Sequence, residues 1–110
     1  MTTKQQTNKP ILWTISGSDC SGGAGIAADI KTGHVLGLEV CHLITANTVQ
    51  NSQKLVAVNP VDLDILKLQA NTLLEDKYPS VIKLGLIANE EQVNWLVDFI
   101  STLKYQQKVS

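Results

Sequence analysis

The sequence predicts an α/β domain with a mostly parallel sheet. Short apolar runs of strand length alternate with longer segments whose apolar residues recur every three or four positions. A glycine-rich turn joins the first apolar run to the first helical segment. Apolar residues make up 44% and charged residues 17% of the 110 residues, which excludes a disordered chain and indicates one packed domain.

The first half of the chain predicts two strands on either side of a turn and a helix. Residues 11–16 are a nearly continuous apolar run, as expected of a buried parallel strand. The turn over residues 17–25 contains four glycines. Residues 26–36 have apolar spacing that fits a helix, and Gly37 provides a stop. Residues 40–49 predict the next strand.

The second half predicts a short extended segment, a helix, a strand and a final helix. After the extended residues 54–58, Asn59 suits a helix N-cap and Pro60 suits the first helical position. One buried face of that helix is predicted from Leu63, Leu66, Ala70 and Leu73. Residues 80–87 predict a strand, and Asn89 is expected to cap the last helix. The buried stripe of the last helix is predicted from Val93, Leu96, Val97, Ile100 and Leu103.

Charge and cysteine content restrict the partners and the cellular compartment. Nine lysines balance ten acidic residues to give a net charge of −1, and there is no arginine, which argues against a nucleic-acid partner. No apolar run approaches the roughly 20 residues of a membrane span. Cys20 and Cys41 lie far apart without metal-ligand spacing, so we expect reduced thiols and a cytoplasmic location.

The ends of the chain predict its domain organisation. Residues 1–9 are polar and are expected to form a solvated lead-in without a secretory signal. Residues 10–110 would then be the front portion of a longer α/β domain, because the last helix leads to a point where another strand should begin. A small complete domain is the alternative.

Several polar and small residues fall where parallel strands end, and ligands bind at that edge of open α/β sheets. The glycine turn matches neither a P-loop nor a dinucleotide-binding fingerprint, so it is either a polar-ligand site at a helix start or a structural turn. Gln50 follows a strand and offers amide donors and an acceptor to a heterocycle. Asp19 is expected to be a turn residue that bonds its own backbone, and Asp29 a solvated helix position.

Three segments resemble a known family. Residues 15–32, ISGSDCSGGAGIAADIKT, resemble the opening signature of hydroxymethylpyrimidine/phosphomethylpyrimidine kinases, which are thiamine-biosynthesis enzymes of the ribokinase-like superfamily. Residues 43–51, LITANTVQN, and residues 83–87, KLGLI, resemble two further motifs in the same order and spacing. The resemblance covers roughly residues 10–99 and implies a ribokinase-like three-layer α/β/α fold with a mostly parallel sheet, here only its N-terminal part.

The resemblance also implies a substrate site. The family binds an aminopyrimidine at the sheet ends, where Gln50 would hydrogen-bond the ring and Leu86, in place of a methionine, would pack against it. Gly17, Ala24 and Thr48 would line the same pocket. Possible supporting residues are Asp19, Gly22, Gly23 and Asp29. Cys20 stands where the family usually has serine, which could shift selectivity.

The implied activity is transfer of the ATP γ-phosphate to 4-amino-5-hydroxymethyl-2-methylpyrimidine and then to its monophosphate. ATP and Mg²⁺ are implied as cofactors, and a homodimer as a possible assembly. The family's catalytic anion hole, of the Gly-Thr-Gly-Cys type, does not occur in these residues, so we expect no turnover by this chain alone and no catalytic or metal-binding residue within it. A pyridoxine- or pyridoxal-type kinase of the same fold and a non-catalytic pyrimidine-binding module are the alternatives.

Overall fold

The computed structural model describes residues 9–107, with side chains up to residue 103. The predicted lead-in over residues 1–9 therefore lies, except for Lys9, outside the described residues. Seven elements follow in the order β1 (Ile11–Asp19), α1 (Gly25–Val35), β2 (Glu39–Gln50), β3 (Leu55–Pro60), α2 (Leu63–Leu74), β4 (Val81–Leu84) and α3 (Glu90–Gln107). The predicted element order is confirmed.

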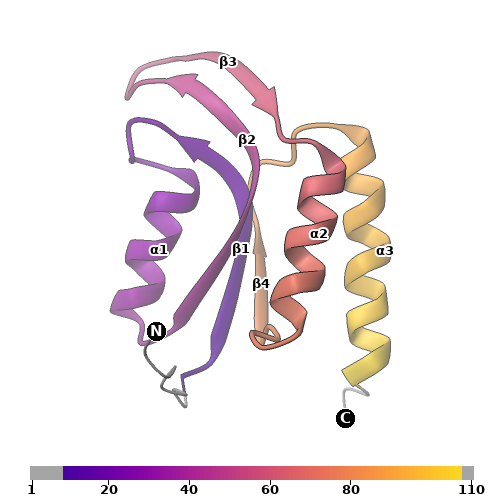
Figure 1. The fold of residues 1–110 in the computed structure, drawn as a ribbon. Helices are drawn as coiled ribbons and strands as arrows, with labels where there is room; N and C mark the ends of the chain where they lie inside the picture. Colours follow the sequence, from indigo (N-terminus) through magenta and orange to yellow (C-terminus); the bar gives the residue numbers. More distant parts are fainter. Residues whose placement is uncertain (1–8, 108–110) are drawn as a thin grey trace, which may run out of the picture.

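The strands form one mixed sheet between two layers of helices. The strand order is β3-β2-β1-β4, in which β1 pairs parallel with β2 and β4, and β3 returns antiparallel to β2. Helix α1 covers one face of the sheet, and α2 and α3 cover the other (Figure 1). This is the predicted three-layer α/β/α arrangement, with the carboxyl ends of β1, β2 and β4 at one edge of the sheet.

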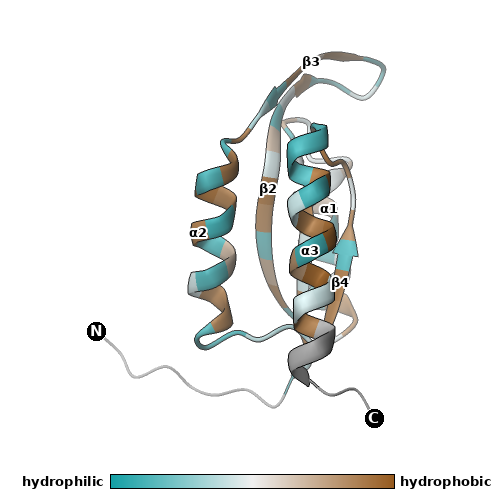
Figure 2. Ribbon diagram, turned by 90° about the vertical axis from the view of Figure 1, so that its right-hand side faces the viewer, coloured by the Kyte–Doolittle hydropathy of each residue, from teal (hydrophilic) through white to brown (hydrophobic). Residues whose placement is uncertain are grey.

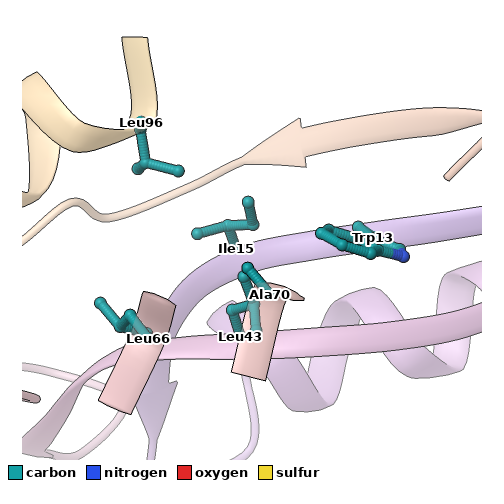
Figure 3. Close-up of a cluster of buried hydrophobic side chains, with 6 residues drawn as sticks. All are labelled: Trp13, Ile15, Leu43, Leu66, Ala70 and Leu96. Carbon is teal, nitrogen blue, oxygen red and sulfur yellow. The ribbon is translucent and has the colours of Figure 1, made fainter. Parts of the chain in front are cut away.

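The main core lies between the sheet and the α2–α3 layer (Figure 3). Its buried members are Trp13 and Ile15 of β1, Leu43 of β2, Leu66 and Ala70 of α2, and Leu96 of α3. Alternate side chains of a strand point to opposite faces, so Thr14, between Trp13 and Ile15, faces α1 instead and bonds Asp29 there. The indole N–H of Trp13 donates to the Lys77 carbonyl at 2.7 Å, which satisfies the polar atom of the largest core side chain.

The predicted start of the second helix is wrong. Asn59 and Pro60 are the last residues of β3, where they pair with Asn47 and Ala46 of β2. The helix N-cap is Asp62, whose carboxylate accepts a hydrogen bond from the Asp64 amide at 2.9 Å. Asn59 and Asp62 are both suitable N-cap residues, but the antiparallel pairing with β2 extends β3 past Asn59. Pro60 is tolerated because it ends an edge strand.

Two other predicted features are shorter or less buried than expected. β4 covers only Val81–Leu84, so Gly85 and Leu86 form a loop beyond the strand. On α3, Val93 and Val97 are 43% and 60% exposed, whereas Leu96 and Leu103 are buried as predicted. The polar Gln92 is fully buried on that helix, because it faces the sheet and the loops around it.

The two outer strands of the sheet, β3 and β4, carry exposed apolar side chains. Much of β3 and β4 is coloured as hydrophobic in Figure 2, and exposed side chains include Leu55, Val56, Val81 and Leu84. The β2–β3 end of the sheet extends beyond α2 and α3 in the same view. Within the described residues, no helix is both long and apolar enough to span a membrane.

Candidate functional site

A hollow of about 270 Å³ opens at the carboxyl ends of β1, β2 and β4. It is lined by Ser16, Gly17, Asp19, Ala24, Gly25, Thr48, Gln50, Lys83, Gly85 and Leu86. The five residues predicted to bind the substrate are all in this lining, and so is Asp19. The other possible supporting residues, Gly22, Gly23 and Asp29, are not.

Asp19 organises the glycine turn, as expected of a turn residue. Its carboxylate accepts hydrogen bonds from the Ser21 amide at 2.9 Å and from the Ser21 hydroxyl at 2.7 Å, and its carbonyl accepts one from the Gly22 amide. The Ser21 hydroxyl and amide lower the pKa of Asp19 below its ordinary value of 3.8. The turn therefore places an ionised carboxylate at the rim of the hollow at neutral pH.

Gly25 brings the turn back against β1. Its φ of +64° lies in the region that side chains disfavour, and an added Cβ would overlap the Gly17 carbonyl. Helix α1 begins at this residue, and the N-cap Ala24 provides no side-chain hydrogen bond. Only glycine allows this close return, which keeps the start of the helix next to the end of β1.

The glycine turn and the end of β2 are joined directly. The Cys20 thiol donates to the Gln50 carbonyl at 3.0 Å, and the Thr48 hydroxyl donates to the Ser18 carbonyl at 2.9 Å. The Thr48 hydroxyl oxygen also lies 2.5 Å from Oε1 of Gln50. The family resemblance requires the turn and position 50 to face one hollow, and the geometry meets that requirement.

The third wall is the loop after β4, which carries Leu86. Its carbonyl accepts from the Thr45 hydroxyl at 2.6 Å, and its amide donates to Ser16 Oγ at 3.3 Å. A Cβ added to Gly17 would lie 2.9 Å from Cδ2 of Leu86, so the absence of a side chain there lets Leu86 approach β1. The side-chain amide of Gln92 donates to the Thr45 carbonyl at 2.9 Å and connects this wall to α3.

Asp29 is not the solvated helix residue that its local sequence predicts. Its side chain is only 15% exposed, accepts from the Thr14 hydroxyl at 2.5 Å and pairs with Lys83 Nζ at 2.9 Å. Burial would raise the pKa of Asp29, but the Thr14 and Lys83 hydrogen bonds and the Lys83 charge outweigh it, so the pKa lies below 3.8. Asp29 thus acts behind the hollow, by holding the lining residue Lys83 against α1.

Besides the glycines of the lining, sequence reasoning missed three side chains of this region. Ser16, Lys83 and Gln92 each make a side-chain hydrogen bond that positions the hollow or its wall. Ser16 and Lys83 lie inside the motifs quoted for the resemblance, which was the only available signal. Gln92 has a typical capping position in its helix, and nothing local indicates that it is buried.

The described residues do not fit a phosphate or metal clamp. They contain no group of three His, Cys, Asp or Glu side chains that could hold a metal ion, and the whole sequence has no arginine. Cys41 is half-buried, and burial is the main cause that raises its pKa, so its thiol stays protonated at neutral pH.

The sequence profile of the phosphomethylpyrimidine kinases matches residues 19–110. The chain belongs to the phosphomethylpyrimidine kinase family. A hydroxymethylpyrimidine/phosphomethylpyrimidine kinase of Rhizobium meliloti is 36% identical over 88 residues, which are 80% of this chain and 33% of the relative. The enzyme of the same name from Bacillus subtilis is 40% identical over 73% of this chain and 30% of its own length. The phosphomethylpyrimidine kinase family member described here thus spans about a third of the length of these relatives.

Solved structures agree on the fold. A crystal structure of a phosphomethylpyrimidine kinase from Clostridium difficile 630 matches with a TM-score of 0.81 and 36% identity, over 87% of this chain and 42% of that one. A pyridoxal kinase from Staphylococcus aureus in complex with AMP-PCP and pyridoxal matches with a TM-score of 0.75 and 29% identity, over 86% of this chain and 35% of that one. The ribokinase-like fold predicted from the motifs is confirmed.

Proposed function

We propose that the whole protein is an ATP-dependent kinase of 4-amino-5-hydroxymethyl-2-methylpyrimidine and its monophosphate, and that this chain supplies the pyrimidine pocket. The observation that carries the proposal is the convergence of the glycine turn and Gln50 on one hollow. Family membership supports the reaction class, since the relatives are named as kinases of this substrate pair.

Each lining residue has a separate role in this proposal. The Gln50 carboxamide hydrogen-bonds the nitrogen edge of the ring, and Leu86 packs against its face. Gly17 and Ala24 contribute almost no side-chain volume, so a flat ring can approach the backbone of β1 and the turn. Thr48 fills the wall next to Gln50. Residues 10–110 act in this proposal as the first part of a kinase domain that works in the cytoplasm. A homodimer is the assembly that the family resemblance implies for the whole protein.

Phosphoryl transfer needs groups that the described residues do not provide. ATP and Mg²⁺ would supply the γ-phosphate and neutralise its charge, but no arginine or acidic cluster is present here to hold them. We therefore expect the 110-residue chain to bind the pyrimidine without phosphorylating it. Incubation with MgATP and the pyrimidine, followed by chromatography of the products, tests this; accumulation of the monophosphate would contradict it.

Calorimetric titration of the chain with the aminopyrimidine tests the pocket. We expect saturable binding that Gln50→Leu weakens by about 1–3 kcal/mol, or about 5- to 150-fold in Kd, because a polar edge of the ligand loses its partner. Gln69→Leu makes the same chemical change on the exposed side of α2 and should leave the affinity unchanged. No binding, or equal affinity in Gln50→Leu, would overturn the proposal.

Pyridoxal is the second candidate substrate. The supporting observation is the structural similarity to pyridoxal kinases, one of which is solved with pyridoxal bound. The two rings are similar in size, and the Gln50 carboxamide can serve either. Titration with both rings separates the two candidates: we expect tighter binding of the aminopyrimidine, and a strong preference for pyridoxal would replace it as the substrate. Absence of kinase activity in the intact protein would instead favour a binding module.

A further inference from the structure

We infer that Thr48 is a specificity-determining residue, because it orients the Gln50 carboxamide so that the oxygen and one N–H face the hollow. The inference rests on the proposed function, since it concerns which ring edge the pocket accepts. Thr48 is only 7% exposed, and Gln50 and Thr48 both line the hollow.

The single proton of the Thr48 hydroxyl determines which way the Gln50 carboxamide is turned. The hydroxyl oxygen lies 2.9 Å from the Ser18 carbonyl oxygen and 2.5 Å from the Oε1 position of Gln50. A hydroxyl has one proton, so it can make only one well-aligned hydrogen bond as a donor, and the Ser18 carbonyl can only accept. Turning the carboxamide by 180° places Nε2 beside Thr48 and satisfies all three groups in one chain, from Gln50 to Thr48 to Ser18.

The backbone restricts Gln50 further. The Cys20 thiol donates to its carbonyl at 3.0 Å, and the pairing of β2 with β3 shifts register between Val49 and Gln50. The end of the strand is therefore held by the glycine turn while its side chain is held by Thr48. Because both its backbone and its side chain are held, Gln50 loses little conformational freedom when a ligand binds.

This orientation sets the hydrogen-bonding pattern that the pocket offers. With Nε2 bonded to Thr48, the groups of the Gln50 carboxamide that remain for a ligand in the hollow are one acceptor, Oε1, and one donor, the second N–H of Nε2. An aminopyrimidine presents the complement, an exocyclic amino donor next to a ring-nitrogen acceptor. The 4-oxo analogue presents an oxygen acceptor next to a ring N–H, so both of its contacts meet a like group unless the carboxamide turns over.

The test compares both rings on the wild-type chain, Thr48→Val and Thr48→Ser by calorimetry. Valine keeps the shape of threonine and removes the hydroxyl, whereas serine retains it. We expect the wild-type chain and Thr48→Ser to prefer the 4-amino ring over the 4-oxo ring by about tenfold or more, and Thr48→Val to lose most of that preference. An undiminished preference in Thr48→Val would overturn the role of Thr48 and leave the proposed function intact.

A second measurement needs no ligand. In ¹⁵N-resolved spectra of the wild-type chain, one of the two Nε2 protons of Gln50 should be shifted and slowed in exchange by its bond to Thr48. Thr48→Val should return both protons to the values of a solvated glutamine, and Thr48→Ser should keep the shift. Solvent-like Nε2 protons in the wild-type chain would overturn the inference, whereas failure of the aminopyrimidine to bind at all would remove the proposed function.

Discussion

Gln92 provides the most demanding test of how the pocket wall is held. Its side chain is fully buried and donates to the carbonyls of Thr45 and Val61 at 2.9 and 3.1 Å, while its Oε1 accepts from the Ala88 amide at 2.9 Å. The Gln92 carboxamide thus joins three segments: β2, the connection between β3 and α2, and the loop that follows Leu86. We predict that Gln92→Leu destabilises the domain.

The size of the effect follows from what each partner would retain. The Thr45 carbonyl would still accept from the Val61 amide at 2.8 Å, so it would not be left unpaired. The Val61 carbonyl and the Ala88 amide would each lose the Gln92 contact, at about 1–3 kcal/mol for a buried group and less near the surface. The leucine side chain fills a similar volume but makes no hydrogen bond. We expect a loss of about 2–4 kcal/mol, a large part of the 5–15 kcal/mol typical of a domain.

Urea unfolding of the chain, followed by circular dichroism, measures this loss. Gln69→Leu, on the exposed side of α2, is the matched control and should change the free energy of unfolding by less than about 0.5 kcal/mol. If the free energy of unfolding of Gln92→Leu lies within about 0.5 kcal/mol of the wild-type value, the buried carboxamide does not hold the wall of the hollow. That result would refute the role given to the contacts of Gln92 with Thr45 and with the loop after Leu86.

Replacing Gly25 by alanine adds a clash with the Gly17 carbonyl of β1 to the strain of a positive φ, so it should lower the free energy of unfolding by about 2–4 kcal/mol. For Gly37→Ala, where φ is +78° but the surrounding space is open, we expect a loss of about 1 kcal/mol. Equal losses in urea unfolding would contradict the close approach. Asp29→Asn should cost about 1 kcal/mol at pH 7 compared with the exposed Asp98→Asn. Because the pKa of Asp29 in the folded chain lies below its ordinary value of 3.8, its stabilisation is present above pH 3.8 and is lost as the pH falls through the folded-state pKa. A difference in the free energy of unfolding from the wild type that does not shrink as the pH is lowered below 3.8 would count against the ion pair. We also expect the exposed apolar side chains of the edge strand β4 to promote self-association of the chain, so Leu84→Lys should reduce light scattering. Unchanged scattering would exclude this strand as the cause.

Local patterns were sufficient to predict the order of the elements, and the family resemblance supplied most of the predicted pocket lining. Asn89 caps α3 by accepting from the Gln92 amide at 2.9 Å, and Gly37 ends α1 with a φ of +78°, both as predicted. Gly17 and Gln50 reach the same hollow because parallel strands end at one edge of the sheet. These features depend on the residue itself or on fold-wide rules, so a single sequence contains the information.

Features that depend on distant partners were not predictable in the same way. Asp29 looks solvated from its neighbours, and its partner Lys83 lies 54 positions away on β4. Asn59 is a good N-cap locally, but pairing with β2 keeps it in a strand. Val97 has the right helical spacing for burial, yet α3 contacts the sheet over a narrower face than the spacing suggests. In each case the tertiary arrangement, rather than the local sequence pattern, determined the outcome.

Chemical-shift mapping of the wild-type chain with 4-amino-5-hydroxymethyl-2-methylpyrimidine tests the central claim most directly. We predict that the shifted backbone amides cluster in residues 17–25, 48–50 and 85–86, which surround the hollow at the sheet edge. A cluster in the surface groove formed by His42 and Leu73, between β2 and α2, or no shift at saturating pyrimidine, would contradict it.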